Sequence, residues 1–479
     1  MTPADYAVLT AVDIAAGIRA RRFSATEIVE AAYAATAAVE PAIHAFSTLA
    51  EPQARAAAAR VDAAVAAGED PGPLAGVPVA IKDLVMTAGI RTTFGSRLYA
   101  DYVPADDDIV VERLKAAGAI VVGKTNAAEF GFGAHGCNLV FDITRNPWDV
   151  SLTPGGSSAG SGAAVAAGVV PLAIGSDGGG SIRIPASFCG LFGMKASMGR
   201  VPLWPGCRDE TLPGASGWES IEHVGPITRT VADAALMLSV IAGPDGRDRW
   251  SIPCGDVDWT GAPAQPLPRK LKVAYWPKWP GLPIDPRITA LVDTAVATYA
   301  EALGFEVTVT EPPAIPIRQA FDVLIALEND LTGLRRLVAE KHVEVTPAVR
   351  QFLATRLPLE AATDAITVRK AWANAMARVM AEVDLILTPT LAALPFAADA
   401  TQPGEIAGVP IGPEDWCPFT YPFNLTGQPA ASVPCGLAEG RLPVGIQIVG
   451  PHLGDGLVLS VAAAFERLAG FSARPSVHA

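Results

Sequence analysis

The sequence predicts an α/β fold in which a β-sheet is covered by helices. Short β-prone runs alternate with alanine-rich helical stretches, as expected for such a sheet. Of the 479 residues, 50% are hydrophobic and 18% are charged, which supplies ample apolar material for a core. This length often means two or three domains, but no composition break or internal repeat divides the chain. We therefore expect one domain over residues 1–479.

The N-terminal part is expected to begin with two helices. Ser24 and Glu27 in "SATE" fit a capping box before "IVEAAYAATAAV", and Pro41 is expected to close this helix. "QARAAAARVDAAVAAG" predicts a second helix ending at Gly68. The run "GVPVAIKDL" (76–84) is β-prone and ends on a lysine and an aspartate. "IVVERLKAAGAIVVGKTN" then predicts a helix, a glycine stop and a strand.

Two Gly-Ser clusters, "TPGGSSAGSG" (153–162) and "SDGGGSIRIP" (176–185), flank regular structure. Between them, "SGAAVAAGVV" predicts a helix and "PLAIGSD" a buried strand. A flexible linker does not alternate with a helix and a strand that must pack, so these clusters are not expected to be linkers.

The C-terminal half continues the alternation of strands and helices. "KLKVAYW" and "GFEVTVTEP" predict strands around a helix at about 286–303, and residues about 315–382 are expected to be mostly helical. "DLILTPT", "AASVPCG" and "PVGIQIVG" predict further strands, followed by a closing helix at about 455–468.

Composition excludes several classes of protein. A formal net charge of -13 argues against a nucleic-acid groove, which needs clustered Lys and Arg. No run approaches the ~18 apolar residues that span a bilayer, and the first residues carry their charges in the reverse order of a secretory signal. We expect a cytoplasmic protein. The cysteines lack a CxxC pair and are expected to be reduced: Cys137, Cys189, Cys207, Cys254, Cys417 and Cys435.

Three catalytic or binding motifs fit the glycine-rich segments poorly. Neither Gly-Ser cluster has the lysine of a Walker loop. "GFGAHG" (131–136) matches GxGxxG, but four residues separate it from the preceding strand, which favours a glycine-permitted bend over a dinucleotide site. "GSSAG" nominates Ser158 as an esterase nucleophile, yet no buried strand leads directly into it. The histidines that such an esterase would need have ordinary settings: His223, His342 and His452.

Lys82 and the two clusters together resemble the amidase signature family. The similarity is dense from about residue 70 to 240, the expected catalytic core, and weaker at "LTPT" and "PVGIQIVGP". It implies a central mixed sheet flanked by helices on both faces, and no cofactor or metal. The motifs that carry it are "GVPVAIKDL", "GKTNAAEFGFG", "TRNPWD", "PGGSSAGSGAAVAAG" and "GSDGGGSIRIPASFCGLFGMK".

The resemblance also implies a catalytic triad, whose members are separated by 75 (157 − 82) and 24 (181 − 157) residues as in the family. Ser181 corresponds to the nucleophile, Ser157 to a bridging serine after a cis peptide, and Lys82 to the base. A serine needs a neighbouring base, and burial can lower a lysine pKa enough for that role. The apolar "VPVAI" before Lys82 is consistent with such burial.

The glycines before the nucleophile are expected to form an oxyanion hole from main-chain N–H groups. Its expected residues are Gly178, Gly179 and Gly180, with the amide of Ser181. The family more often has another residue where Gly178 stands, and "SSGGS" where this chain has "SSAGS". Supporting hydrogen bonds are expected from Ser158, Asp177 and Arg183, although a structural ion pair accounts equally well for Arg183.

The resulting hypothesis is hydrolysis of an amide through an acyl-enzyme on Ser181. An aryl or aliphatic amide, or a carbamate as in related urethanases, is the expected small-molecule substrate; esters could follow the same path. The pocket is expected to involve residues about 300–382 and the loop 204–220, with Phe130, Trp204 and Trp218, unless these tryptophans merely pack the loop.

Three other functions remain as alternatives. The chain could be the A subunit of a tRNA-dependent amidotransferase, which passes ammonia to a partner, or an inactive binding homologue, or an esterase that uses Ser158. The intact Lys82, Ser157 and Ser181 argue against an inactive homologue. Neither nucleic acid nor membrane is expected as a partner, and a homodimer is compatible with the sequence.

Overall fold

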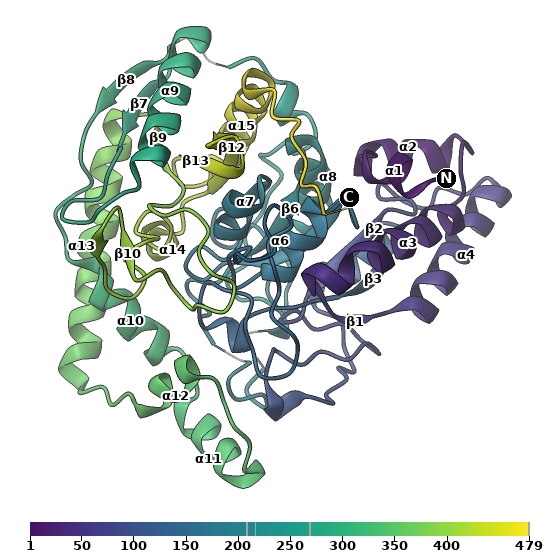
Figure 1. The fold of residues 1–479 in the computed structure, drawn as a ribbon, viewed down its shortest axis with the longest axis horizontal. Helices are drawn as coiled ribbons and strands as arrows, with labels where there is room; N and C mark the ends of the chain where they lie inside the picture. Colours follow the sequence, from purple (N-terminus) through teal and green to yellow (C-terminus); the bar gives the residue numbers. More distant parts are fainter. Residues whose placement is uncertain (207–208, 216, 268–269, 478–479) are drawn as a thin grey trace.

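The computed structural model describes residues 1–206, 209–215, 217–267 and 270–477 (Figure 1). Its strands are β1 (Phe46–Leu49), β2 (Pro78–Lys82), β3 (Ile120–Thr125), β4 (Leu172–Ser176), β5 (Phe192–Lys195), β6 (Val224–Thr228), β7 (Lys272–Tyr275), β8 (Glu306–Val309), β9 (Leu385–Pro389), β10 (Glu405–Ile406), β11 (Val409–Pro410), β12 (Ala430–Ala438) and β13 (Leu442–Val449). Within this part of the chain, eleven strands form one sheet in the order β1-β3-β2-β4-β6-β5-β12-β13-β9-β7-β8, while β10 pairs with β11.

The large sheet is mixed, as the family resemblance implies. β3, β2 and β4 are parallel neighbours, and so are β9, β7 and β8. The strands between these two groups pair antiparallel. The α/β fold class is therefore confirmed, whereas the one-domain organisation stays a prediction.

Helices flank the sheet along its length (Figure 1). They are α1 (Pro3–Ala7), α2 (Ala11–Arg19), α3 (Ala25–Ile43), α4 (Glu51–Ala67), α5 (Ile109–Ala116), α6 (Ala159–Ala166), α7 (Arg183–Cys189), α8 (Val231–Ile241), α9 (Pro286–Leu303), α10 (Ile317–Leu327), α11 (Leu331–Lys341), α12 (Pro347–Ala354), α13 (Leu359–Glu382), α14 (Pro422–Thr426) and α15 (Asp455–Ala469), with 3₁₀ turns η1 (Arg97–Tyr99), η2 (Glu129–Gly131) and η4 (Ala262–Ala264). α6 and α7 pack together against the middle strands, and α8, α9 and α15 form a second group on β4 to β6 and β12 to β13.

The predicted end of the first long helix was wrong by two residues. Ser24 Oγ accepts from the Glu27 N–H at 3.1 Å, as the capping box predicts. The helix nevertheless runs through Pro41 to Ile43 and ends at His44, which adopts a left-handed conformation with φ 47°. Pro41 has no N–H to donate, so the helix passes it with one hydrogen bond fewer, and the His44 N–H still donates to the Glu40 carbonyl at 3.0 Å.

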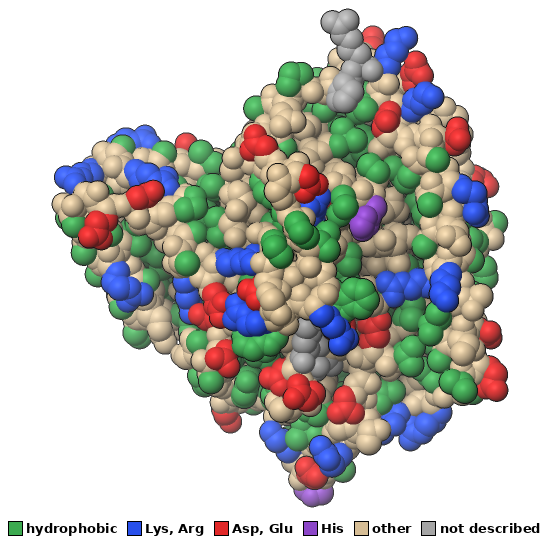
Figure 2. Space-filling model, turned by 180° about the vertical axis from the view of Figure 1, so that it is seen from behind, with side chains coloured by type: hydrophobic (Ala, Val, Ile, Leu, Met, Phe, Trp, Pro, Cys, Tyr) green, Lys and Arg blue, Asp and Glu red, His purple; other side chains and the backbone are tan. Residues whose placement is uncertain are grey.

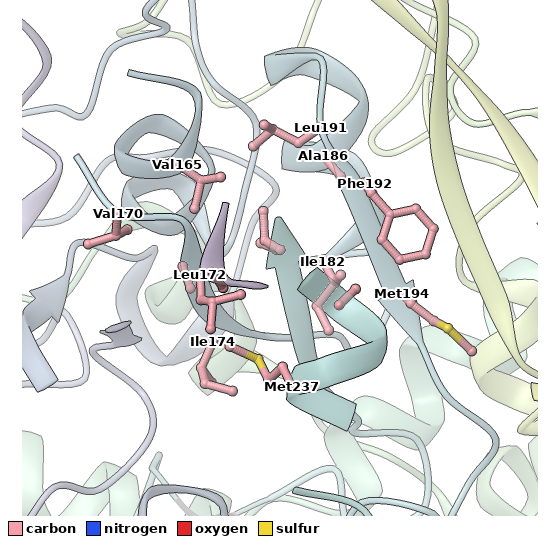
Figure 3. Close-up of a cluster of buried hydrophobic side chains, with 14 of the residues drawn as sticks. Val165, Val170, Leu172, Ile174, Ile182, Ala186, Leu191, Phe192, Met194 and Met237 are labelled. Atoms are coloured by element: carbon pink, nitrogen blue, oxygen red, sulfur yellow. The ribbon is translucent and has the colours of Figure 1, made fainter. Parts of the chain in front are cut away.

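The core is continuous around the segment between the two Gly-Ser clusters. Every residue of α6 is buried, and β4 is buried along its whole length. Figure 3 shows Val165 of α6 and Ile174 of β4 within one cluster, together with Met194 of β5 and Met237 of α8. The glycine-serine loops at either end are therefore anchored by packed structure.

Surface charges of both signs are mixed (Figure 2), and the described cysteines are unpaired. In the face shown in Figure 2, Lys and Arg side chains are interspersed with Asp and Glu. No helix among the described residues has the length and apolarity to cross a bilayer. The described cysteines are free thiols, and Cys207 lies outside the described residues.

Candidate active site

Two neighbouring parallel strands bring Lys82 close to the second glycine-serine cluster. β2 and β4 pair in parallel, with Val79 opposite Leu172 and Ile81 opposite Ile174. Because the carboxyl ends of parallel strands meet at one edge of a sheet, Lys82 and Ser176, the last residues of the two strands, lie side by side. Lys82 Nζ donates to Ser176 Oγ at 2.8 Å and to the Ser176 carbonyl at 3.3 Å.

Burial makes Lys82 easier to deprotonate than an ordinary lysine. The side chain is 0% exposed, and its Nζ lies 2.7 Å from Ser157 Oγ. Burial lowers the pKa of Lys82 well below that of an ordinary lysine, although the charges of Glu222 and Asp177 act in the opposite direction. A buried lysine with a lowered pKa and a hydroxyl in contact is the arrangement of a base that activates a serine.

Ser157 lies on the loop that enters α6, and its peptide bond with Gly156 is cis. Its side chain is buried between Lys82 and the start of α6. The neighbouring Ser158 is also buried, and its Oγ donates to the Ser176 carbonyl and accepts from the Ser176 N–H, both at 3.2 Å. Ser158 thus fixes the end of β4, and no histidine is among its hydrogen-bond partners in the described chain, which weakens the esterase alternative.

Ser181 is partly exposed at the start of the turn into α7, on a loop held by one buried ion pair. Arg183 Nε and Nη2 each donate to the Asp177 carboxylate at 2.9 Å, and both side chains are 0% exposed. Burial alone would raise the pKa of Asp177, but the Arg183 charge and hydrogen bonds outweigh it and hold that pKa well below its usual range. Asn424 Nδ2 donates to Asp177 Oδ1 at 2.9 Å.

The loop leaves some of the predicted oxyanion donors free. In the described structure the N–H groups of Gly178, Gly179 and Ser181 have no main-chain or side-chain acceptor. The N–H of Gly180 instead donates to Asp177 Oδ1 at 2.7 Å. The expectation that Gly180 supplies a free oxyanion donor was therefore wrong. Thr420 Oγ1 donates to the Gly179 carbonyl at 2.7 Å, which fixes the orientation of that peptide.

A cavity with aromatic and aliphatic walls opens beside Ser181. Its lining includes Phe132, Trp218, Ile221, Phe321, Ile325 and Tyr421. The Phe321 and Tyr421 rings lie 4.9 Å apart, and Glu414 at the edge is paired with Arg318. The wall is mostly apolar, so it suits an apolar substrate group.

The three predicted pocket residues lie in different places. Trp218 lines the cavity beside Ser181, and its Nε1 has no hydrogen-bond partner among the residues that the structure describes. Phe130 lines a neighbouring cavity, which Trp218 and Ser176 also border. Trp204 lines neither of these cavities; its ring packs under the Arg247 guanidinium, 4.7 Å from the ring centroid.

Sequence reasoning missed several residues that hold the site together. Arg183 Nη1 donates to Gln447 Oε1 and to the Thr420 carbonyl, both at 2.8 Å, and Nη2 donates to Asn424 Oδ1 at 2.7 Å. Gln447 offered a signal, because it is the one polar side chain in the apolar strand "PVGIQIVG" and burial demands a partner for it. Ser176 and Glu222 offered none, since their roles depend on which strands are neighbours.

Comparisons with known proteins show the family of this chain. The amidase family profile matches residues 27–459. The A subunit of glutamyl-tRNA(Gln) amidotransferase from Carboxydothermus hydrogenoformans is 38% identical, over 98% of this chain and 99% of the relative. An acylamidase of Rhodococcus erythropolis is 36% identical, over 97% and 96%. The crystal structure of a bacterial aryl acylamidase of the amidase signature family superimposes with a TM-score of 0.89 at 31% identity, over 98% of both chains.

Proposed function

Because the chain belongs to the amidase signature family, we propose that it hydrolyses the C–N bond of small amides through an acyl-enzyme on Ser181. The contact of 2.7 Å between Lys82 Nζ and Ser157 Oγ carries this proposal, because it couples a buried amine to a hydroxyl, and the same amine contacts Ser176 at the start of the cluster that contains Ser181. The roles of Lys82, Ser157 and Ser181 are those that the sequence resemblance implies.

The reaction begins when Ser181 Oγ attacks the amide carbonyl. Its proton passes to Ser157 Oγ, which gives its own proton to neutral Lys82. The N–H groups of Gly178, Gly179 and Ser181 stabilise the negative oxygen of the tetrahedral intermediate. A proton then returns through Ser157 to the amide nitrogen, the C–N bond breaks and the amine leaves. Water attacks the ester by the same relay, which releases the acid and restores Ser181.

The proposed substrates are aryl or aliphatic amides, with carbamates as a further class. The apolar wall formed by Phe132, Trp218, Phe321 and Tyr421 supports this choice, because an aromatic or alkyl group beside the reacting carbonyl would be desolvated there. One relative is named an acylamidase and one similar solved structure is that of an aryl acylamidase, which supports an amide substrate. We also propose that the enzyme works in the cytoplasm without a membrane or nucleic-acid partner.

The role of an amidotransferase A subunit remains a second candidate function, because relatives of that name match nearly the whole chain. Such a subunit would release ammonia from an amide donor for use by a partner. The apolar cavity favours a hydrophobic amide over a small polar donor such as glutamine.

The purified chain tests these two functions directly. Without a partner, it should hydrolyse a panel of anilides, aliphatic amides and carbamates faster than it hydrolyses glutamine. Ser181→Ala should abolish turnover, Lys82→Ala should severely slow acylation, and Ser158→Ala should leave the acylated residue unchanged. Mass spectrometry of the trapped acyl-enzyme should place the added mass on Ser181. Normal turnover by Ser181→Ala, or acylation of Ser158, would overturn the proposal.

A further inference from the structure

Glu222 is a buried carboxyl group close to the catalytic lysine that the proposed relay does not use. It lies just before β6, which pairs antiparallel with β4, with Ser176 opposite Val224. Asp177 and His223 continue the pairing, with N–H to carbonyl distances of 2.7 and 3.2 Å. One residue further along this register, Glu222 lies opposite Gly178. Because side chains alternate along a strand, those of Glu222 and Ser176 are on the same side of the pair.

The Ser176 hydroxyl lies between Lys82 and the segment that carries Glu222. Ser176 Oγ lies 2.8 Å from Lys82 Nζ, and Ser176 and Glu222 line the same cavity, where the Ser176 hydroxyl opposes the rise in the pKa of Glu222. Glu222 is 8% exposed, and among the described residues its Oε2 has no hydrogen-bond partner. A buried carboxylate oxygen without a donor is costly unless a nearby positive charge or a proton compensates it.

Glycine at position 178 makes room for this carboxyl group. A Cβ atom built on Gly178 would lie 2.7 Å from Glu222 Oε2 and 2.9 Å from the Trp218 ring. A larger residue there would displace Glu222 from its place beside Ser176. Glycine at position 178 is therefore needed for Glu222 to keep this place.

We propose that Glu222 is a positioning residue for the base, because its carboxyl group acts through Ser176 on the proton of Lys82 and sets the pH at which Ser181 becomes activated. This inference rests on the proposed function, in which neutral Lys82 drives the reaction. A negative charge on Glu222 favours the charged amine, so the carboxylate keeps Lys82 protonated to a higher pH than burial alone would.

Three other titratable groups near Glu222 do not replace it. Asp177 is paired with Arg183, and His223 on the same segment is turned away, with Nε2 3.4 Å from Lys195 Nζ and Nδ1 2.8 Å from the Ile221 carbonyl. Asp108, the N-cap of α5, borders the same cavity as Glu222 but accepts from the Val110 N–H at 3.2 Å. The pKa of Glu222 also reflects its coupling to Lys82. Burial raises that pKa, and the Lys82 charge opposes the rise.

The test is the pH dependence of Ser181 labelling by phenylmethanesulfonyl fluoride, which needs no knowledge of the natural amide. In Glu222→Gln, the acidic limb of the labelling rate should move to lower pH by about one unit, the scale of a close charge pair. Glu222→Asp keeps the negative charge but moves it one methylene further from Ser176. The acidic limb of its labelling rate should therefore also move to lower pH, but by less than that of Glu222→Gln. Glu301→Gln, which removes an exposed charge on α9, should leave the limb in place.

The outcomes separate this inference from the proposed function. If wild-type protein is labelled at Ser181 but the limbs of Glu222→Gln and Glu222→Asp coincide with it, Glu222 has only a structural role and the inference is wrong. A shift to higher pH would also overturn it. If Glu222→Gln does not fold, Glu222→Asp alone decides. If Ser181→Ala is labelled as well as the wild type, the proposed function itself fails.

Discussion

Replacement of Asp177 by Asn tests how the nucleophile's loop is held. The carboxylate accepts from Arg183 Nε and Nη2 and from the Gly180 N–H, at 2.7 to 2.9 Å. Asn removes the charge while keeping the size of the side chain. The buried Arg183 guanidinium would then face only neutral acceptors, supplied by Gln447, Asn424 and the Thr420 carbonyl.

The expected loss of stability follows from the burial of the Asp177–Arg183 ion pair. Breaking a buried ion pair by removing one charge costs about 3–5 kcal/mol. For 479 residues, an unfolding entropy of about 2.1 cal/mol/K per residue gives roughly 1 kcal/mol/K. We therefore expect Asp177→Asn to lower the melting temperature by about 3–5 °C. The turnover rate should fall as well, because the Gly180 and Ile182 amides lose the charged acceptor that orients the loop.

Differential scanning calorimetry at one fixed scan rate measures the effect, since large proteins often unfold irreversibly. Asp364→Asn, an exposed aspartate on α13, is the matched control and should melt like the wild type. Combining Asp177→Asn with Arg183→Gln should cost less than the sum of the single changes, because no unpaired charge remains. A melting temperature of Asp177→Asn within about 1 °C of the wild type would refute this reasoning.

Three further predictions concern the base, the loop and the cavity. Since burial lowers the pKa of Lys82, kcat/KM should fall as the pH drops through that lowered value, well below 10.5, and Lys82→Arg should be inactive at every pH because arginine stays protonated. Gly180→Ala should reduce kcat at least tenfold, since Gly180 has φ 130° and an added Cβ would lie 2.6 Å from Thr420, whereas Gly404→Ala has open space and should be neutral. Phe321→Ala, which opens the apolar wall, should lower kcat/KM for anilides more than for acetamide; equal losses for both would contradict the proposed role of the cavity.

Local sequence signals predicted many of the helices and strands. They did not predict short strands that contain residues disfavoured in strands. Gly68 and Gly304 end α4 and α9 in left-handed conformations, as glycine C-caps do. β6 was not predicted, because "VGPIT" contains glycine and proline, which disfavour strands. It forms nevertheless, since β4 and β5 pair with it on both sides.

Motif spacing predicted the residues of the candidate site that lie in recognisable motifs, but not those from distant segments. Lys82, Ser157 and Ser181 lie in motifs that can be compared residue by residue, and two of them are in contact. Phe321 and Tyr421 could not be predicted, since they come from distant segments that only the folded chain brings to the cavity. Trp204 shows the converse: an aromatic residue in a loop near the site packs against Arg247 instead of lining the cavity.

The hydrogen-bond acceptors of Arg183 also determine when the site can be completed during synthesis of the chain. Its acceptors on Thr420, Asn424 and Gln447 follow it by 237, 241 and 264 residues. At about 5–20 residues per second, a ribosome needs roughly 15–50 s to add the last of them. A nascent chain therefore carries its serines and lysine long before the guanidinium can be fully bound, and we expect activity to arise only after the C-terminal strands have emerged and docked.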